Sequence, residues 1–277
     1  MQLHLFQWDL IEAGNGHACL AKLDFDQAED HFSRVLVALP GHQMAESGLR
    51  SVQYWQQVFE AIDDVERVEA FTCLWQRIKA FSFPATEASR MLRANLIRHL
   101  LFLINGTATL YVPPDLCSGY LHLQLGEYLT AETHLRTLIE CSPGNGRLYG
   151  YLADALWLQG RREIAGGVYA TALLVDPQQV NVSDLCNRQL AQVIEQHGAA
   201  LAPVYGFLRG ILPLVDQELA TDNAATKIYA LLRQAERALH GNDGATMGNV
   251  RRELQQLAPE VLDDYLHLHA GLRFPAV

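Results

Sequence analysis

Histidines and paired carboxylates are the side chains of this sequence whose types could do metal or acid–base chemistry. His267 and His269 are two positions apart, which on a helix turns their side chains about 200° away from each other. They therefore cannot share a metal ion from one face. The pairs Asp63–Asp64 and Asp263–Asp264 are sequence neighbours, and such neighbours do not face each other on a helix. We expect these carboxylates on a solvated surface and predict neither a metal site nor an acid–base pair.

The patterns of nucleophilic, phosphate-binding and metalloprotease sites do not occur in the sequence, which has no GxSxG, no GxxxxGKS/T and no HExxH. The cysteines are odd in number and form no CxxC pair, which argues against a disulfide framework and against a zinc site. We therefore predict a non-enzymatic protein with reduced thiols, no catalytic residue and no cofactor. The cysteines are Cys19, Cys73, Cys117, Cys141 and Cys186.

The composition indicates an acidic, folded, soluble protein. Of the 277 residues, 49% are hydrophobic and 19% are charged, and the formal net charge is -10. Such a protein lacks the positive surface that attracts nucleic acids and anionic membranes. No Lys or Arg precedes an apolar run at the N-terminus, and the densest apolar run, residues 100–104, is far too short to span a bilayer. We predict a cytoplasmic protein that binds neither nucleic acid nor membrane.

Glycine, alanine and proline recur in the middle of the chain at one interval, which indicates an internal repeat. The glycine separates two apolar helical stripes and suits the left-handed residue that ends a helix. The alanine lets the two helices approach closely, and the proline stops the second helix. Each copy therefore predicts two antiparallel helices joined by a tight turn. The pairs separated by 34 residues are Gly126 with Gly160, Ala131 with Ala165, and Pro143 with Pro177.

A third copy lies near the N-terminus, where Ala28, Phe32 and Pro40 keep the same spacings. Leu23-Asp24 stands there in place of the turn glycine. The chain from Arg251 to Pro259 also resembles the second half of a degenerate hairpin. We predict an all-α protein built as one continuous solenoid. Its segments are an N-terminal hairpin over 1–42, helical hairpins without clear repeat residues over 43–111, a tandem pair over 112–179 and a C-terminal capping segment over 180–277.

These spacings resemble the tetratricopeptide repeat, a 34-residue helix hairpin with the pattern W-x2-L-G-x2-Y, then A-x3-F and P. The three copies cover a little over a third of the chain. The resemblance implies an α–α superhelix of stacked hairpins, in which the aromatic residue fills the gap between successive hairpins. It also implies a concave groove that binds a peptide or a partner protein. The later copy reads Tyr149-x2-Leu152-Ala153-x2-Leu156, then Ala165-x3-Tyr169, then Pro177.

By this resemblance, the first helix of each hairpin lines the groove. Trp157 and Tyr120 are the aromatic anchors that we select, although packing between hairpins would explain both equally well. Arg147 is the one basic residue among these positions, which favours a mixed apolar and polar ligand, such as a helix laid in the groove. The expected groove residues are His17, Leu20, Ala21, Tyr120, Leu123, Gln124, Arg147, Asp154, Trp157 and Leu158.

Two alternatives to partner binding stay open. A solenoid with an exposed apolar face could close a homodimer, so that assembly is the function. A pocket between the repeats and the C-terminal helices could instead belong to a small-molecule sensor or an enzyme.

Two glycines inside the second helix of the last copy, Gly166 and Gly167, each cost about 1 kcal/mol relative to alanine. Close packing against a neighbouring helix is the expected compensation, and a hinge is the alternative. The remaining segments are also expected to be helical, with a polar cap at the C-terminal end. We expect two helices within 43–81 and single helices over 85–104, 183–196, 201–212, 222–240, 245–257 and 259–269.

Overall fold

A computed structural model describes residues 7–63, 65–104, 110–217 and 223–270, so that Asp64 and Asp222 lie outside the described residues. Within these ranges the chain forms fourteen α-helices. The only strand-like pairing described there is an isolated bridge between Val112 and Leu116. The all-α prediction is confirmed.

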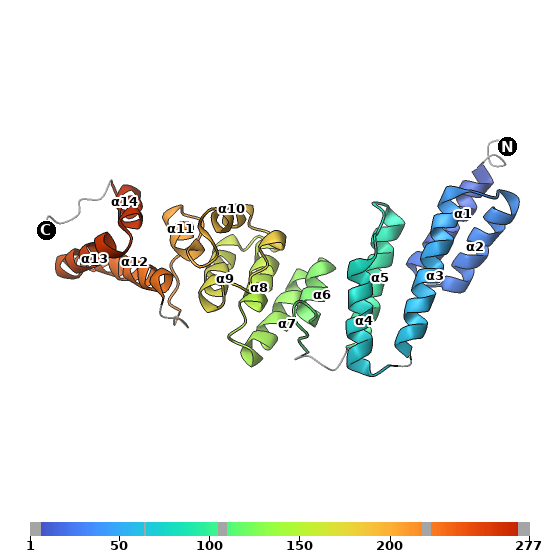
Figure 1. Ribbon diagram of the computed structural model, residues 1–277, viewed down its shortest axis with the longest axis horizontal. Helices are drawn as coiled ribbons and strands as arrows, with labels where there is room; N and C mark the ends of the chain where they lie inside the picture. Colours follow the sequence, from blue (N-terminus) through green and yellow to red (C-terminus); the bar gives the residue numbers. More distant parts are fainter. Residues whose placement is uncertain (1–6, 64, 105–109, 218–222, 271–277) are drawn as a thin grey trace. The chain divides into compact units, whose positions relative to one another are not determined.

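The chain divides into two compact units, Met1–Leu121 and His122–Val277, whose helices are labelled in Figure 1. The first unit contains α1 (Trp8–Ala21), α2 (Phe25–Ala38), α3 (Gln43–Asp63), α4 (Arg67–Ala80) and α5 (Glu87–Leu103), and α6 (Ser118–Gln124) includes the boundary. The second unit contains α7 (Tyr128–Cys141), α8 (Gly146–Leu158), α9 (Arg162–Val175), η2 (Val182–Asp184), α10 (Arg188–His197), α11 (Ala202–Leu208), α12 (Ala224–His240), α13 (Gly244–Leu257) and α14 (Pro259–Leu268).

One type of turn joins four helix pairs: α1 to α2, α6 to α7, α8 to α9, and α12 to α13. A residue with positive φ ends the first helix of each pair. The next amide donates to the carbonyl five residues earlier, for example Arg161 N–H to Leu156 O at 3.0 Å. This is the bonding of a Schellman cap, which satisfies the last carbonyls of the helix. The positive-φ residues are Leu23 (64°), Gly126 (77°), Gly160 (82°) and Asn242 (53°).

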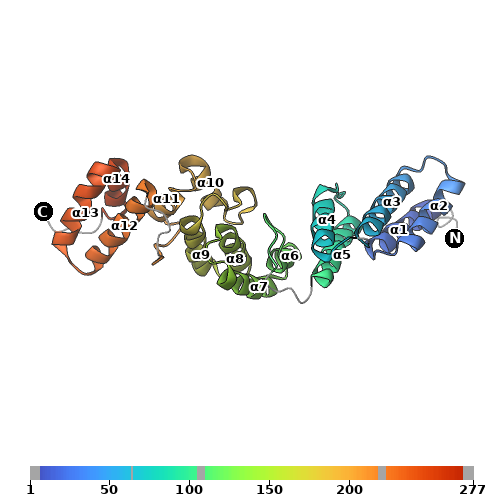
Figure 2. The same ribbon diagram turned by 60° about the horizontal axis from the view of Figure 1, so that its bottom comes forward.

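Small buried residues lie at matching distances from these turns. Seven positions before each turn is a buried glycine or alanine, and five positions after the first three turns is a fully buried alanine. In α1–α2, α8–α9 and α12–α13, whose helices pack together, missing side-chain bulk at these positions lets the backbones approach closely. Figures 1 and 2 show α8 and α9 side by side. The residues are Gly16, Gly119, Ala153 and Ala235 before the turns, and Ala28, Ala131 and Ala165 after them.

Phe32 is a fully buried residue in the core of the first unit. A Cβ atom added to Gly16 would lie 2.7 Å from Cε1 of Phe32, and one added to Gly48 would lie 2.3 Å from its Cζ. The aromatic ring therefore occupies the space between α1 and α3 that the two glycines leave open. The side-chain amide of Asn95 on α5 donates to the carbonyl of Ala21 at 2.7 Å, which joins α5 to the end of α1.

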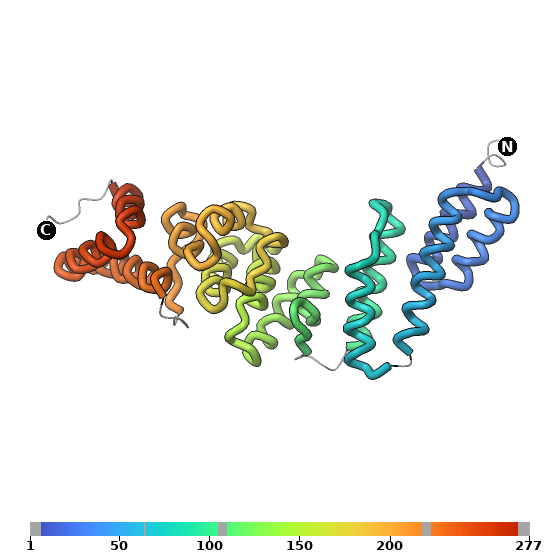
Figure 3. The backbone as a smooth tube through the Cα atoms, in the orientation of Figure 1, coloured from blue at the N-terminus to red at the C-terminus, as the bar shows by residue number. Residues whose placement is uncertain are grey.

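In the second unit, the helix expected over 201–212 ends at Leu208. Gly210 has a φ of 66°, and the amides of Ile211 and Leu212 turn back to the carbonyl of Gly206. Residues 210–217 then continue without helix, and we call them the strap; Figure 3 shows this stretch of backbone between α11 and α12.

The strap lies against the two helical glycines of α9. A Cβ on Gly166 would lie 3.2 Å from Cδ of Pro213, and one on Gly167 would lie 3.7 Å from Cγ1 of Val215. Close packing therefore accounts for the glycine pair, but the packed element is an extended segment and not the expected helix. Any side chain at position 166 would have to push the proline away.

Helix starts in the second unit follow local capping groups. The helix expected from position 183 begins at Arg188, because the side chain of Asn187 accepts the amide of Leu190 at 3.1 Å. Asn223 forms a capping box with Thr226 at the start of α12. The remaining predicted helices agree with the observed bounds to within a few residues.

Candidate functional site

Four of the expected groove residues, His17, Leu20, Ala21 and Tyr120, belong to the first unit, and all four contact its interior. Leu20 and Ala21 are buried, at 3% and 1% exposure, so they are core residues and not groove residues. Tyr120 is only 8% exposed, and its ring centroid lies 6.1 Å from that of Trp75. Trp75 is itself held by a 2.8 Å hydrogen bond from its indole N–H to Asp115. The half-buried ring of His17 meets the edge of Phe32 at 4.9 Å. Tyr120 is therefore a core residue, and a partner could not reach its ring.

Asp154, which was expected to line the groove, is buried, with 5% exposure. Its carboxylate accepts a hydrogen bond from the hydroxyl of Tyr169 and another from the amide of Cys186 at 2.9 Å. Burial raises the pKa of Asp154 to about 6, although both hydrogen bonds oppose this rise. The three residues form a network that ties α8, α9 and the segment before α10 together.

The same network keeps its other members protonated. Burial and the neighbouring Asp154 carboxylate raise the pKa of the Cys186 thiol to about 12 and raise the pKa of Tyr169 as well. A thiol needs to ionise to act as a nucleophile, so Cys186 is a hydrogen-bond donor here. The network's chemistry is therefore structural and sensitive to pH.

Trp157 reaches a pocket of about 610 Å³ next to this network. One wall comes from α8 and α9, and the other comes from the start of α10 and the strap. Among the described groove candidates, Trp157 is the one that lines it; Leu158 is 42% exposed, and Leu123, Gln124 and Arg147 are half-buried elsewhere. The lining residues are Trp157, Arg162, Glu163, Gly166, Asn187, Gln189, Gly210, Ile211, Leu212 and Pro213.

Arg162 lies over Trp157, with its guanidinium carbon 5.2 Å from the centre of the indole ring. This is the geometry of a cation–π contact. Within the described part of the chain, neither Arg162 nor Glu163 forms an ion pair. The preceding Arg161 differs, because its guanidinium bonds to Glu132 at 2.8 Å. The pocket thus has an exposed cation that the fold itself does not neutralise.

The start of α9 differs from the other second helices in charge. The residue after the turn is acidic in the other three pairs, and Asp24 and Asp243 cap their helices through their carboxylates. In α9 this residue is Arg161, whose side chain makes no capping hydrogen bond. The start of α9 therefore lacks, at this position, the acidic residue that favours a helix N-terminus, and of its two arginines only Arg161 is paired with a carboxylate among the described residues.

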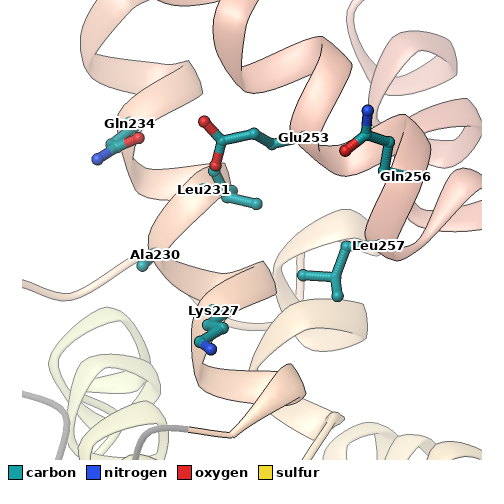
Figure 4. A pocket seen from close by; sticks show the side chains of 7 residues that line it. All are labelled: Lys227, Ala230, Leu231, Gln234, Glu253, Gln256 and Leu257. Carbon is teal, nitrogen blue, oxygen red and sulfur yellow. The ribbon is translucent and has the colours of Figure 1, made fainter.

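A second pocket, of about 550 Å³, lies between α12 and α13 (Figure 4). Its lining is mixed: Leu231 and Leu257 are its larger apolar residues, and four of its side chains are polar or charged. Gln234, eight positions before the Asn242 turn, is exposed, whereas Leu152, eight positions before the Gly160 turn, is buried. This face therefore exposes a polar side chain where the corresponding face of α8 is packed. Its lining is Lys227, Ala230, Leu231, Gln234, Glu253, Gln256 and Leu257.

The described residues contain no group of three His, Cys, Asp or Glu side chains placed to hold a metal ion. None of the described helices has the length and apolar character of a bilayer-spanning segment. Comparison with protein-family models, with curated proteins and with solved structures gives no match to this chain. The likeness to tetratricopeptide repeats therefore stays a prediction from the residues.

Sequence reasoning found Trp157 but not the other wall of its pocket. Residues 187–189 and 210–213 are more than 20 positions away in sequence, and they follow none of the repeat spacings. A usable signal was present in Gly166-Gly167 together with Gly210 and Pro213. Two helical glycines require a close neighbour, and a glycine followed by a proline marks the end of a helix.

Proposed function

We propose that this protein is a non-enzymatic binding module built from stacked, tetratricopeptide-like hairpins, and that it holds a peptide or a partner protein at the Trp157 pocket. The observation that supports this most directly is the half-exposed indole of Trp157, with a cation above it and an apolar strap opposite. Aromatic residues beside charged groups are typical of the few positions that dominate binding energy.

The repeat itself does not require a tryptophan at this position. Three positions before the other turns the chain has Leu20, Leu123 and Leu239. A leucine is thus sufficient for the turn, and Trp157 adds a larger surface and an N–H donor. Such an amphipathic ring suits an interface in which one edge of the ring is buried and the other stays in contact with water.

The test is affinity purification from native lysate with three forms of the full chain: wild type, Trp157→Leu and Trp8→Leu. Trp157→Leu restores the residue that the other turns use, so its fold should be retained, as circular dichroism would verify. Trp8→Leu is the matched control, because Trp8 is also exposed but lies on α1. We expect Trp157→Leu alone to lose a partner. Identical partners for all three forms would refute the proposal.

The volume of the pocket favours one second candidate, a small-molecule sensor. Pockets of about 300–1,000 Å³ are typical of small-ligand sites, and this one is within that range. Thermal denaturation with a metabolite library checks this candidate. A compound that stabilises the wild type but not Trp157→Leu would support it.

A further inference from the structure

We propose that the Trp157 pocket recognises an acidic side chain that lies next to an apolar one in a segment of the partner, with Arg162 as the receptor of the carboxylate. This inference rests on the proposed function, since it states the chemistry of the partner at the same site.

Arg162 is positioned for a ligand before one arrives. Its guanidinium is held 5.2 Å above Trp157, and the fold provides it with no carboxylate within the described residues. Its neighbour Arg161 shows the structural alternative, with both oxygens of Glu132 within 3.0 Å of the Arg161 Nη1 atom. A planar guanidinium that is already ordered by stacking loses less freedom when it binds a carboxylate. Arg162 therefore complements an anion that comes from outside.

The strap, which forms the pocket wall opposite Trp157, indicates that the ligand also has an apolar side chain. Ile211, Leu212 and Pro213 line the pocket together with Trp157. Leu212 is 3% exposed, and Pro213 rests on Gly166, so this wall is held in place by packing. A ligand with only a charged side chain would leave the apolar surface of Ile211 and Pro213 exposed to water. An aromatic or branched side chain beside the acid would cover them and would shield the ion pair from water.

Glu163 limits how acidic the partner segment is. It lines the pocket beside Arg162 and forms no ion pair within the described residues. A second carboxylate in the ligand would meet this like charge, and the chain's net charge of -10 would repel an acidic run from a distance. The recognised segment therefore carries a single acid next to its apolar residue.

Three N-acetylated, C-amidated hexapeptides provide the probe, with phenylalanine followed by glutamate, glutamine or lysine between glycines. The full chain is labelled with 5-fluorotryptophan, and ¹⁹F NMR follows the Trp157 signal, assigned by its loss in Trp157→Phe. We expect the glutamate peptide to shift this signal with a Kd about fivefold below that of the glutamine peptide, the lysine peptide to bind most weakly, and added salt to reduce the difference.

Arg162→Gln should remove the preference for glutamate, and Arg162→Glu should reverse it towards lysine. Arg252→Gln is the matched control, because Arg252 is an exposed arginine on α13 outside the pocket. Equal affinity for the three peptides, a preference that survives Arg162→Gln, or no shift of the Trp157 signal would each overturn the inference. If Trp157→Leu still loses its partner in the lysate experiment, the proposed function stands and only the partner chemistry fails.

Discussion

The helix pairs α1–α2 and α8–α9 use the same turn but close their hairpins with opposite chemistry. Nine positions after each turn is an aromatic residue, Phe32 in the first pair and Tyr169 in the second. Phe32 fills an apolar gap between glycines, whereas the hydroxyl of Tyr169 bonds to the buried Asp154. One position in the repeat can thus serve either pure packing or a polar network. The polar version occurs beside the candidate site.

A second difference is the residue six positions after the turn, which is glutamate in α1–α2 and in α6–α7 but glycine in α8–α9. Glu29 bonds to Gln56 at 3.5 Å, and Glu132 bonds to Gln159 at 3.0 Å, so that both pairs span 27 residues. In α9 this position is Gly166, and the space is taken by Pro213. The carboxylate–amide pair of the other two hairpins is thus absent at α9, where the strap occupies the space beside Gly166.

The largest expected effect is a difference in pH dependence between the two hairpins. The pKa of Asp154 rises from 3.8 in an exposed aspartate to about 6 in the fold, an interval that corresponds to about 3 kcal/mol. Because the folded pKa is the higher one, the stabilisation by the neutral acid is complete below pH 3.8 and is lost as the pH rises through 6. Urea unfolding of the wild type and Asp154→Asn between pH 4 and 7 should show profiles that diverge by this amount.

Tyr169→Phe sharpens the same comparison, since it gives α8–α9 the aromatic residue of α1–α2. The lost hydroxyl no longer lowers the pKa of Asp154, so the decline in stability should extend to higher pH than in the wild type. Parallel profiles for the wild type and Asp154→Asn would show that the network does not titrate and would break the contrast.

A smaller effect is expected from filling the apolar gap of the first hairpin. Gly48→Ala places a Cβ 2.3 Å from the Phe32 ring, and we expect it to lower the free energy of unfolding by about 2 kcal/mol. Gly14→Ala is the control, because nothing lies within 4 Å of its Cβ. This substitution should stabilise α1 by up to about 1 kcal/mol. Urea denaturation measures both, and two changes of equal sign would contradict the role of Phe32.

The smallest effect tests the turn that these two hairpins share with α12–α13. Gly160→Ala puts a side chain on a residue with a φ of 82° and should destabilise the protein by about 1 kcal/mol. Asn242→Gly should do the reverse at the corresponding turn, by a few tenths of a kcal/mol. Thermal denaturation compares the two variants. If both change stability in the same direction, the turns are not equivalent.

The sequence was sufficient for the helices and for most of their pairing, because glycine, alanine and proline act locally. Gly160 ends a helix through its own backbone, and Pro177 stops one through its own ring. The end of α12 was predicted at Gly241, but the residue with positive φ is the next one, Asn242, because asparagine also tolerates this conformation. Its geometry was nevertheless available from Pro259, which follows it by the same 17 residues that separate Gly160 from Pro177.

The candidate site was less predictable, because it depends on contacts between distant segments. Asp154 was expected to line the groove, because the sequence does not show that the amide of Cys186, 32 positions later, donates to its carboxylate. Tyr120 was expected either in the groove or packed between hairpins, and its contact with Trp75, on a different helix, does not follow from any repeat spacing. Pro213 could be assigned to no partner from the sequence, because an extended segment has no period that matches a helix face. Burial of polar side chains depends on tertiary context, which composition and spacing do not encode.

Gly166 has a consequence for how this chain could grow. Arrays of hairpins lengthen when a unit is duplicated and stacked on its neighbour, and each added unit needs the contacts that its predecessor made. At α9 the carboxylate that would receive the next unit's amide is missing, and Pro213 already covers its place. An engineer who appends consensus hairpins after α9 would have to introduce glutamate at position 166 and delete residues 210–217. Insertion before α8, where Glu132 and Gln159 already meet, needs neither change.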